Sequence, residues 1–178
     1  DQGEAMSLSD TVVLMREGHI EQIGTPAELY GHPATTFAAQ FIGEPPMALI
    51  DGSALGHEAP VTVGLRPEDM SLGPTGRCDL DAVIADVEFL GGETRLALDH
   101  PAAGGLAVIL PGPAHYAPGQ SVGVVIPQEN RRLFNAATGV LEKAPHQDPV
   151  AQGRTGSAPE DGHKAIVSPR SIKEDLLK

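Results

Sequence analysis

The first 43 residues constrain the fold most, because they combine strand and helix signals whose apolar faces all need covering. Residues 12–15 form an unbroken apolar run, which is typical of a strand buried on both faces. A turn at residues 16–19 leads to a second predicted strand at residues 20–23, which ends at Gly24. Nothing earlier in the sequence can cover these faces, so we expect this stretch to be the end of a larger domain.

Helix signals surround these strands. Thr25 can act as an N-cap, Pro26 suits the first helical position, and Glu28 can bond back to the cap amide. A second helix is predicted to begin at Pro33 and to stop at Gly43. Its apolar face consists of Phe37, Ala38, Phe41 and Ile42. A shorter helix is expected near the start of the chain, from the spacing of Asp1, Glu4, Met6 and Leu8.

Charge is distributed unevenly along the chain. Residues 1–142 carry 6 basic and 19 acidic side chains, a net charge of −13, whereas residues 143–178 carry 6 basic and 5 acidic ones, a net charge of +1. An acidic body repels phosphate backbones, and an aromatic content of 3% without tryptophan leaves few rings for base stacking. Both properties disfavour nucleic acid as a partner.

A single cysteine, Cys78, cannot close a disulfide within the chain, which favours a reducing compartment. No apolar run reaches the ~20 residues that span a bilayer. The N-terminus also lacks the basic-then-apolar pattern of a secretion signal. We therefore expect any membrane association to come through a partner.

Pro45 and Pro46 end the helical part, because proline donates no amide and restricts its predecessor, and they mark a domain boundary. Short segments with a period of two follow, separated by turn residues. The predicted strands cover residues 61–65, 83–89, 94–98, 106–110 and 122–126. This pattern predicts a small antiparallel barrel or sandwich. Gly91 and Gly92 predict a hairpin turn, since a phosphate cradle needs a helix after it.

Titratable residues show neither metal-ligand nor acid–base spacing. The histidines are His19, His32, His57, His100, His115, His146 and His163. The acidic residues of the middle segment are Asp79, Asp81, Asp86, Glu88 and Glu93, which we expect to form a solvated acidic face. We therefore assign no catalytic, cofactor-binding or metal-binding residue.

Taken together, residues 1–43 resemble the end of the nucleotide-binding domain of an ATP-binding cassette (ABC) importer ATPase, of the carbohydrate and glycerol-phosphate uptake type. In that family, threonine-histidine-aspartate-glutamine and a variable residue precede Glu-Ala-Met. The matching residues are Asp1, Gln2, Glu4, Ala5, Met6, Asp10, Gly18, Glu21, Gln22, Gly24, Pro26, Glu28, Tyr30, Pro33, Phe37, Phe41, Ile42 and Gly43. The resemblance implies a C-terminal fragment that starts just after the switch histidine, which contacts the ATP γ-phosphate in the family.

The sequence contains no G-x-x-x-x-G-K-[ST] phosphate loop. The resemblance places that loop, the signature segment, the metal-binding aspartate and the catalytic glutamate upstream of Asp1. It implies ATP and Mg²⁺ as cofactors of the intact parent and none for this chain alone. We expect this chain by itself to be inactive as an ATPase.

Later residues resemble the accessory domain that follows the ATPase core in this family. Residues 63–69 resemble its G-[IV]-R-P-E segment, and residues 87–94 resemble V-E-x-L-G-x-E-T. Leu133, Phe134, Thr138 and Gly139 resemble the H-L-F…T-G ending, where Arg132 replaces the usual histidine. The resemblance implies an all-β barrel of the TOBE type, similar to the oligonucleotide/oligosaccharide-binding (OB) fold. In relatives this domain holds two ATPase subunits together and receives regulatory signals.

Arg66, Glu68, Asp69 and Glu93 are the candidate regulatory or interface residues. Two interpretations stay open for Arg66 and Glu68. They contact a subunit or a regulator, or the Arg-Pro-Glu turn caps strand ends through charge-assisted bonds to its own backbone.

Three segments are therefore expected in an α+β chain. Residues 1–43 are the end of a P-loop ATPase α/β domain, residues 44–142 are the OB-like barrel, and residues 143–178 are a tail that the resemblance does not cover. The tail is poor in large apolar residues, so we expect disorder and one marginal helix at residues 169–177.

The favoured function is the C-terminal part of the ATP-binding subunit of an ABC transporter, whose parent couples ATP hydrolysis to import of a sugar or glycerol phosphate. The resemblance implies a homodimer with permease subunits and a regulatory protein, at the cytoplasmic face of the membrane. Residues 43–47 resemble the G-x-P-x-M of carbohydrate-uptake members, although Ala48 replaces the usual asparagine. The alternative is a stand-alone OB-like module that senses a small oxyanion or a regulatory protein.

Overall fold

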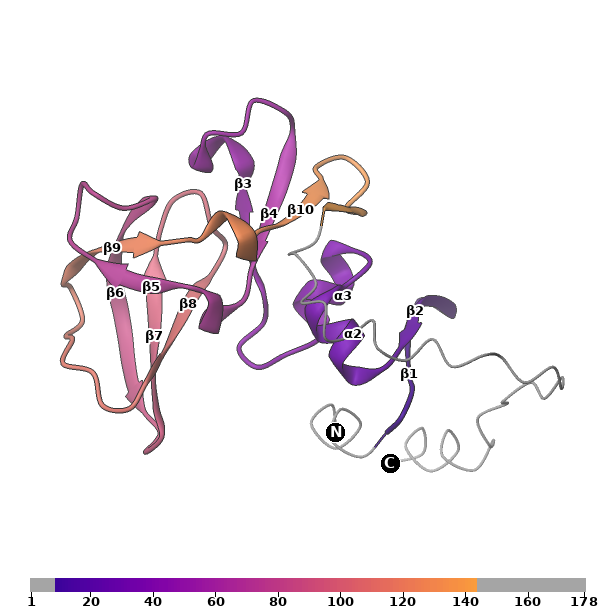
Figure 1. The fold of residues 1–178 in the computed structure, drawn as a ribbon, viewed down its shortest axis with the longest axis horizontal. Coiled ribbons are helices and arrows are strands. Elements are labelled where there is room, and N and C mark those ends of the chain that lie inside the picture. Colours follow the sequence, from indigo (N-terminus) through magenta and orange to yellow (C-terminus); the bar gives the residue numbers. More distant parts are fainter. Residues whose placement is uncertain (1–8, 144–178) are drawn as a thin grey trace, which may run out of the picture. The chain divides into compact units, whose positions relative to one another are not determined.

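The computed structural model describes residues 9–143, so the predicted first helix and nearly all of the tail lie outside the described residues. The described part is mostly β-strand, with short helices near its start (Figure 1). The elements are β1 (Val12–Arg16), β2 (His19–Gly24), α2 (Pro26–Gly31), α3 (Thr36–Phe41), β3 (Ala48–Asp51), η1 (Gly52–Leu55), β4 (Val61–Leu65), η2 (Pro67–Asp69), β5 (Ser71–Gly73), β6 (Leu80–Phe89), β7 (Glu93–Asp99), β8 (Leu106–Pro111), β9 (Ser121–Val125), η3 (Gln128–Asn130), β10 (Arg132–Asn135) and β11 (Leu141–Lys143).

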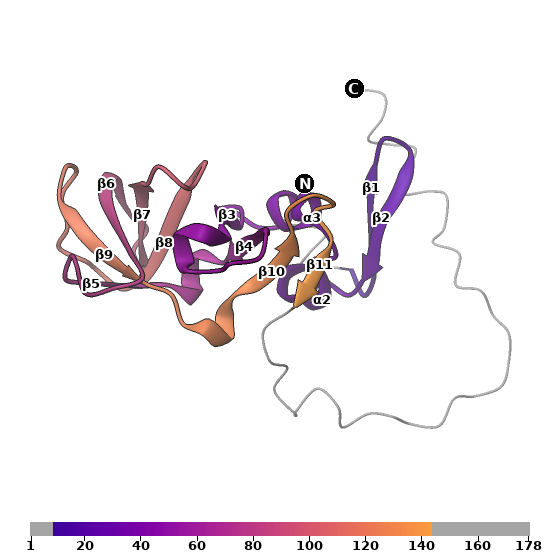
Figure 2. The ribbon, with the colours of Figure 1, turned by 90° about the horizontal axis from the view of Figure 1, so that it is seen from above.

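Strands β1 and β2 form an antiparallel hairpin, as the sequence predicts (Figure 2). The prediction that the first strand is buried on both faces is wrong for the described residues. Leu14 is buried and packs with Leu29, Ala38 and Ile42 of the helices. Its neighbour Met15 is 54% exposed, because the helices cover one face of the hairpin and no described residue covers the other.

Helix α2 has the capping box that the sequence predicts. The Thr25 hydroxyl accepts from the Glu28 amide at 3.2 Å, and the Glu28 carboxylate accepts from the Thr25 amide at 2.8 Å. The predicted start of the next helix at Pro33 is wrong. Helix α3 begins at Thr36 because the hydroxyl of Thr35, its N-cap, accepts from the Ala38 amide at 3.2 Å.

A four-stranded antiparallel sheet has the order β11-β10-β4-β3 (Figure 2). Only β4 of these strands is predicted from sequence alternation. The sheet brings the end of the described chain back to its beginning, because the Thr36 amide donates to the Gly139 carbonyl at 2.8 Å and the Leu141 amide donates to the Ala34 carbonyl at 2.9 Å. The last two strands are therefore tied to the start of α3.

A five-stranded antiparallel sheet has the order β5-β9-β6-β7-β8 (Figure 1). Its five strands include the four that the sequence predicts after residue 80, and the hairpin turn at Gly91 and Gly92 is confirmed by the pairing of β6 with β7. No pairing of β5 with β8 closes this sheet among residues 9–143. The antiparallel β architecture is thus confirmed, whereas a closed barrel is not present in the described residues.

One apolar core is shared by the two larger sheets. Val63 and Leu65 of β4, Leu96 of β7, Val108 of β8 and Val124 of β9 all have 0% exposure. Burying each such side chain contributes roughly 1.5–3 kcal/mol. No helix among the described residues has the length and apolar character needed to cross a membrane.

Candidate functional site around Arg66

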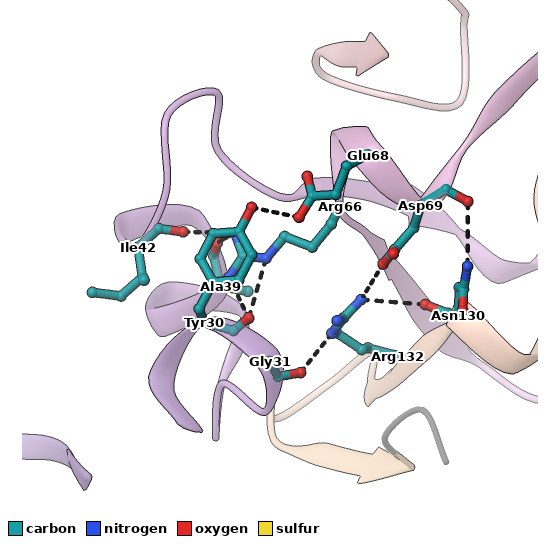
Figure 3. Close-up of polar contacts among 9 residues, drawn as sticks. All are labelled: Tyr30, Gly31, Ala39, Ile42, Arg66, Glu68, Asp69, Asn130 and Arg132. Carbon is teal, nitrogen blue, oxygen red and sulfur yellow. Dashed lines mark hydrogen bonds and ion pairs between the residues drawn. The ribbon is translucent and has the colours of Figure 1, made fainter. Parts of the chain in front are cut away.

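The guanidinium of Arg66 is buried between strand β4 and the helices α2 and α3. Arg66 has 0% exposure, and it follows β4 directly with extended backbone, as expected for a residue that precedes proline. Its Nε and Nη2 donate to the Tyr30 carbonyl at 3.2 and 2.8 Å (Figure 3). Its Nη1 donates to the carbonyls of Ile42 at 2.6 Å and Ala39 at 3.4 Å. One side chain thus satisfies backbone acceptors at the ends of two helices.

These acceptors explain how a buried cation is tolerated. The last carbonyls of a helix lack intrahelical partners and carry the negative end of its dipole, so they favour a cation. The Arg66 guanidinium also lies over the Tyr30 ring, with 3.9 Å between its central carbon and the ring centre. Burial lowers the pKa of Arg66 to about 10, which still leaves it charged at neutral pH.

Tyr30 forms a second link across the same junction. Its hydroxyl donates to the Glu68 carboxylate at 2.6 Å, so α2 is bonded to η2 through this pair (Figure 3). Burial and this hydrogen bond to a carboxylate raise the pKa of Tyr30 to about 12. Tyr30 therefore stays protonated and keeps donating through the physiological range.

Arg132 holds the other side of α2. Its Nε donates to the Gly31 carbonyl at 2.7 Å, and its Nη1 forms an ion pair with Asp69 at 3.0 Å (Figure 3). Nη1 also donates to the Asn130 carbonyl at 3.2 Å. Arg132 is the residue that replaces the histidine usual at this motif position, and its length lets it reach both α2 and η2.

Gly43 leaves the space that the Arg66 guanidinium and the Tyr30 ring occupy. It has a φ of +109°, and a Cβ placed on it comes within 2.9 Å of Arg66 Nη1 and 3.0 Å of the Tyr30 ring. A side chain here strains the backbone and displaces the guanidinium. The requirement for glycine after α3 thus has a local physical cause.

Three of the four candidate residues meet in this junction, which we call the Arg66 junction and define by Tyr30, Arg66, Glu68, Asp69 and Arg132. Arg66 bonds to carbonyls 24 to 36 residues earlier in the chain, and not to its own turn as the local interpretation has it. Glu68 is exposed beside it.

Glu93 lies elsewhere, at the start of β7. Its carboxylate accepts from Arg95 Nε at 2.9 Å, and both side chains are about one-third exposed. No hydrogen bond joins Glu93 to the Arg66 junction among the described residues. The structure therefore groups Arg66, Glu68 and Asp69 and leaves Glu93 apart.

Tyr30 and Arg132 complete the junction and are absent from the candidate set derived from sequence. Tyr30 and Arg132 both lie at positions of the family motifs given above, and that could have singled them out. Only the fold shows which residues they contact. Among residues 9–143, no group of three or more His, Cys, Asp and Glu side chains is arranged to hold a metal ion. The hydrogen bonds and the ion pair of the Arg66 junction link α2 to Arg66, to η2 and to β10.

Residues 63–134 match the family model of the TOBE domain. The similar curated proteins are ATP-binding subunits. The sn-glycerol-3-phosphate import ATP-binding protein UgpC of Jannaschia sp. (strain CCS1) is 40% identical over 129 residues, which are 62% of this chain and 36% of that protein. The protein of the same name from Rhodopseudomonas palustris (strain BisB5) is 38% identical over 163 residues, 76% of this chain and 45% of that protein. UgpC 2 of Rhizobium johnstonii is 45% identical over 107 residues, 55% of this chain and 31% of that protein.

The chain belongs to the family of ABC importer ATP-binding subunits. It spans less than half the length of these curated relatives. The TOBE match begins within β4 and ends within β10, so it contains Arg66, Glu68, Asp69 and Arg132, whereas Tyr30 lies before it. The Arg66 junction therefore joins the TOBE-matching residues of this family member to the helices that precede them.

Proposed function

We propose that this chain is the C-terminal part of an ABC importer ATP-binding subunit, whose parent couples ATP hydrolysis to uptake of a sugar or glycerol phosphate. The names of the relatives and the TOBE match support this proposal. The observation that carries it is the Arg66 junction, in which one buried cation binds the ends of two helices and lies within the TOBE-matching region. We expect these bonds to hold the two parts together as one unit.

The proposed organisation has three segments. Residues 1–43 end the nucleotide-binding domain, residues 44–142 form the OB-like accessory domain, and residues 143–178 are a tail. ATP with Mg²⁺ binds in the ATPase part of the parent, which works as a homodimer with permease subunits at the cytoplasmic face of the membrane. The chain alone then lacks ATPase activity, and phosphate release that survives repurification contradicts this organisation.

The candidate residues take different roles in this proposal. Arg66 is a positioning residue inside the subunit, because its guanidinium is fully enclosed. Glu68 and Glu93 expose carboxylate to solvent and serve a regulatory or subunit surface. Asp69 forms an ion pair with Arg132 inside the junction.

A chimera tests the proposal. This chain replaces the matching C-terminal region of UgpC from Rhodopseudomonas palustris (strain BisB5), in cells that lack their own ATP-binding subunit for sn-glycerol 3-phosphate import. We expect uptake of sn-glycerol 3-phosphate by the chimera, and loss of most uptake in its Arg66→Met variant. The matched control is Arg77→Met, which removes an exposed arginine outside the junction. A folded, membrane-associated chimera without uptake contradicts the proposal.

A further inference from the structure

The start of helix α3 is held from two directions by contacts that lie outside the Arg66 junction. One side consists of two side chains of β2, Glu21 and Gln22, and the other is the backbone of the turn between β10 and β11. The Arg66 guanidinium holds the opposite end of the helix, through the Ala39 and Ile42 carbonyls. The two ends of α3 are therefore attached by separate groups of residues.

The side chains of β2 hold the connection between α2 and α3. Gln22 uses both polar atoms of its amide, because Nε2 donates to the His32 carbonyl at 3.0 Å and Oε1 accepts from the Ala34 amide at 2.8 Å. The hydroxyl of Thr35, the N-cap of α3, donates to the Glu21 carboxylate. A hydrogen bond to an ionised group is stronger than one between neutral groups. Because all three bonds are partly buried, they fix this connection on β2.

The turn between β10 and β11 binds the same connection from the other side, through backbone atoms. The Thr36 amide donates to the Gly139 carbonyl at 2.8 Å, and the Leu141 amide donates to the Ala34 carbonyl at 2.9 Å. Gly139 has a φ of +70°, and a Cβ placed on it comes within 2.6 Å of Thr36 Oγ1. Any other residue at this position therefore strains the backbone and pushes the turn away from α3.

The turn side of this attachment is poorly buried. Val140 is 50% exposed, and Glu142 and Lys143 at the end of β11 are exposed as well. Strand β11 has 3 residues at the edge of its sheet, and its pairing with β10 shifts register between Leu133 and Phe134. Segments with few buried contacts open at a lower free energy than the core of a protein. We therefore expect the turn side to open before the β2 side.

We propose that residues 139–141 are a latch on α3, which opens locally while the two larger sheets and the Arg66 junction stay formed. When the latch opens, its two backbone bonds to the start of α3 break together, because both come from one short turn. The side chains of β2 keep their bonds, and Arg66 keeps the end of the helix. The latch follows the TOBE-matching residues, which end at residue 134. This inference does not depend on a transport role, since it rests on contacts within the chain.

Native-state hydrogen exchange of the full chain, followed by NMR at increasing urea concentrations, tests the proposal. The Thr36 and Leu141 amides report the latch, and the Ala34 amide reports the bond to Gln22. The amides of β7 report the five-stranded sheet, in which β7 is paired on both sides. We expect Thr36 and Leu141 to share one protection factor, about tenfold or more below those of Ala34 and β7. It should hardly depend on urea, because local opening exposes little surface.

Gly139→Ala and Gly76→Ala form a matched pair, because the two glycines have a similar positive φ, of +70° and +73°. A Cβ at Gly76 meets no atom within 4 Å, and Gly76 lies outside the latch. Both substitutions strain the folded chain, but only strain within the closed latch lowers the free energy of opening it. We expect Gly139→Ala to speed the exchange of Thr36 and Leu141 about tenfold, and Gly76→Ala to leave both unchanged.

Three results overturn the proposal. If Thr36 and Leu141 show the urea dependence of β7, or if the two glycine variants speed their exchange equally, these amides exchange through global unfolding. If the protection factors of Thr36 and Leu141 differ by more than about tenfold, the two backbone bonds do not break together. If Ala34 is as weakly protected as Thr36, the connection leaves β2 as well. The wild-type measurement decides the proposal by itself where a variant fails to fold.

Discussion

The Arg66 guanidinium covers the Tyr30 ring at 3.9 Å and at the same time donates two hydrogen bonds to the Tyr30 carbonyl. Arg66 therefore contacts both the side chain and the main chain of Tyr30. Since the Tyr30 hydroxyl also donates to Glu68, which lies two residues after Arg66, the contacts form a closed ring. Contacts that share partners in this way are expected to be non-additive when mutated.

Replacing Arg66 by methionine should destabilise the fold by about 2–4 kcal/mol, because the carbonyls of Tyr30 and Ile42 remain buried without a donor. Equilibrium unfolding in urea measures the change. Arg95→Met is the control, since Arg95 is one-third exposed and pairs with Glu93 at the surface, and it should cost about 1 kcal/mol or less. Equal losses in the two variants contradict the structural role of Arg66.

The Tyr30–Glu68 bond predicts a specific pH dependence. The pKa of Tyr30 is raised from 10.0 to about 12 in the folded protein, so its contribution to stability is fully present below pH 10 and is lost as the pH rises toward 12. Arg66 has the opposite sign, because burial lowers its pKa and unfolding therefore takes up a proton in that range. The wild type should lose stability relative to Tyr30→Phe between pH 10 and 12.

Urea midpoints of the two proteins at several pH values in this window measure the difference. Tyr116→Phe removes the other of the two tyrosines and leaves the Tyr30–Glu68 bond in place. A constant difference between the wild type and Tyr30→Phe across the window speaks against a retained proton on Tyr30.

Arg132 and Asp69 should show a coupling energy of about 1 kcal/mol in a double-mutant cycle, because the pair is largely buried and hydrogen bonded. Arg132→Gln should cost more than Asp69→Asn, since it also removes the donor to the Gly31 carbonyl. Unfolding free energies of the two single variants and the double variant give the cycle. Strict additivity of the two substitutions would show that the ion pair contributes nothing.

Gly64→Ala should destabilise the fold by about 1–3 kcal/mol, because the added Cβ comes within 2.6 Å of Met47 Sδ and 2.7 Å of the Phe134 ring. Gly92→Ala is the matched control: a Cβ at Gly92 meets no atom within 4 Å and its backbone is outside the left-handed region. Thermal unfolding compares the two variants. A Gly64→Ala protein as stable as Gly92→Ala contradicts the close packing of β4 against Met47 and Phe134.

Much of the fold could be predicted where the pattern is local. Alternation at Val61, Val63 and Leu65 predicts β4 because each of these residues faces one core. The capping box at Thr25 and Glu28 predicts α2 because both partners lie within one turn. Strands β3 and β10 are only 4 residues each, and their strand character comes from pairing with β4, which a short stretch of sequence does not reveal.

The Arg66 junction could be predicted only in part. The motif around Arg66, Glu68 and Asp69 marks three residues that the fold brings together, but the rule that long cationic side chains stay exposed predicts the wrong environment for Arg66. The burial of Arg66 depends on carbonyls of Tyr30 and Ile42, which the helices place there. Distant backbone acceptors leave no periodic signal in the sequence.

The pairing of Arg132 with the Gly31 carbonyl spans 101 residues. The ribosome makes α2 long before it makes β10. During synthesis, the Gly31 carbonyl therefore lacks its Arg132 donor until the chain has grown to that residue. Until β10 emerges, water is the donor available to that carbonyl. This corner of the fold can therefore close only after Arg132 has been synthesised, however early α2 forms.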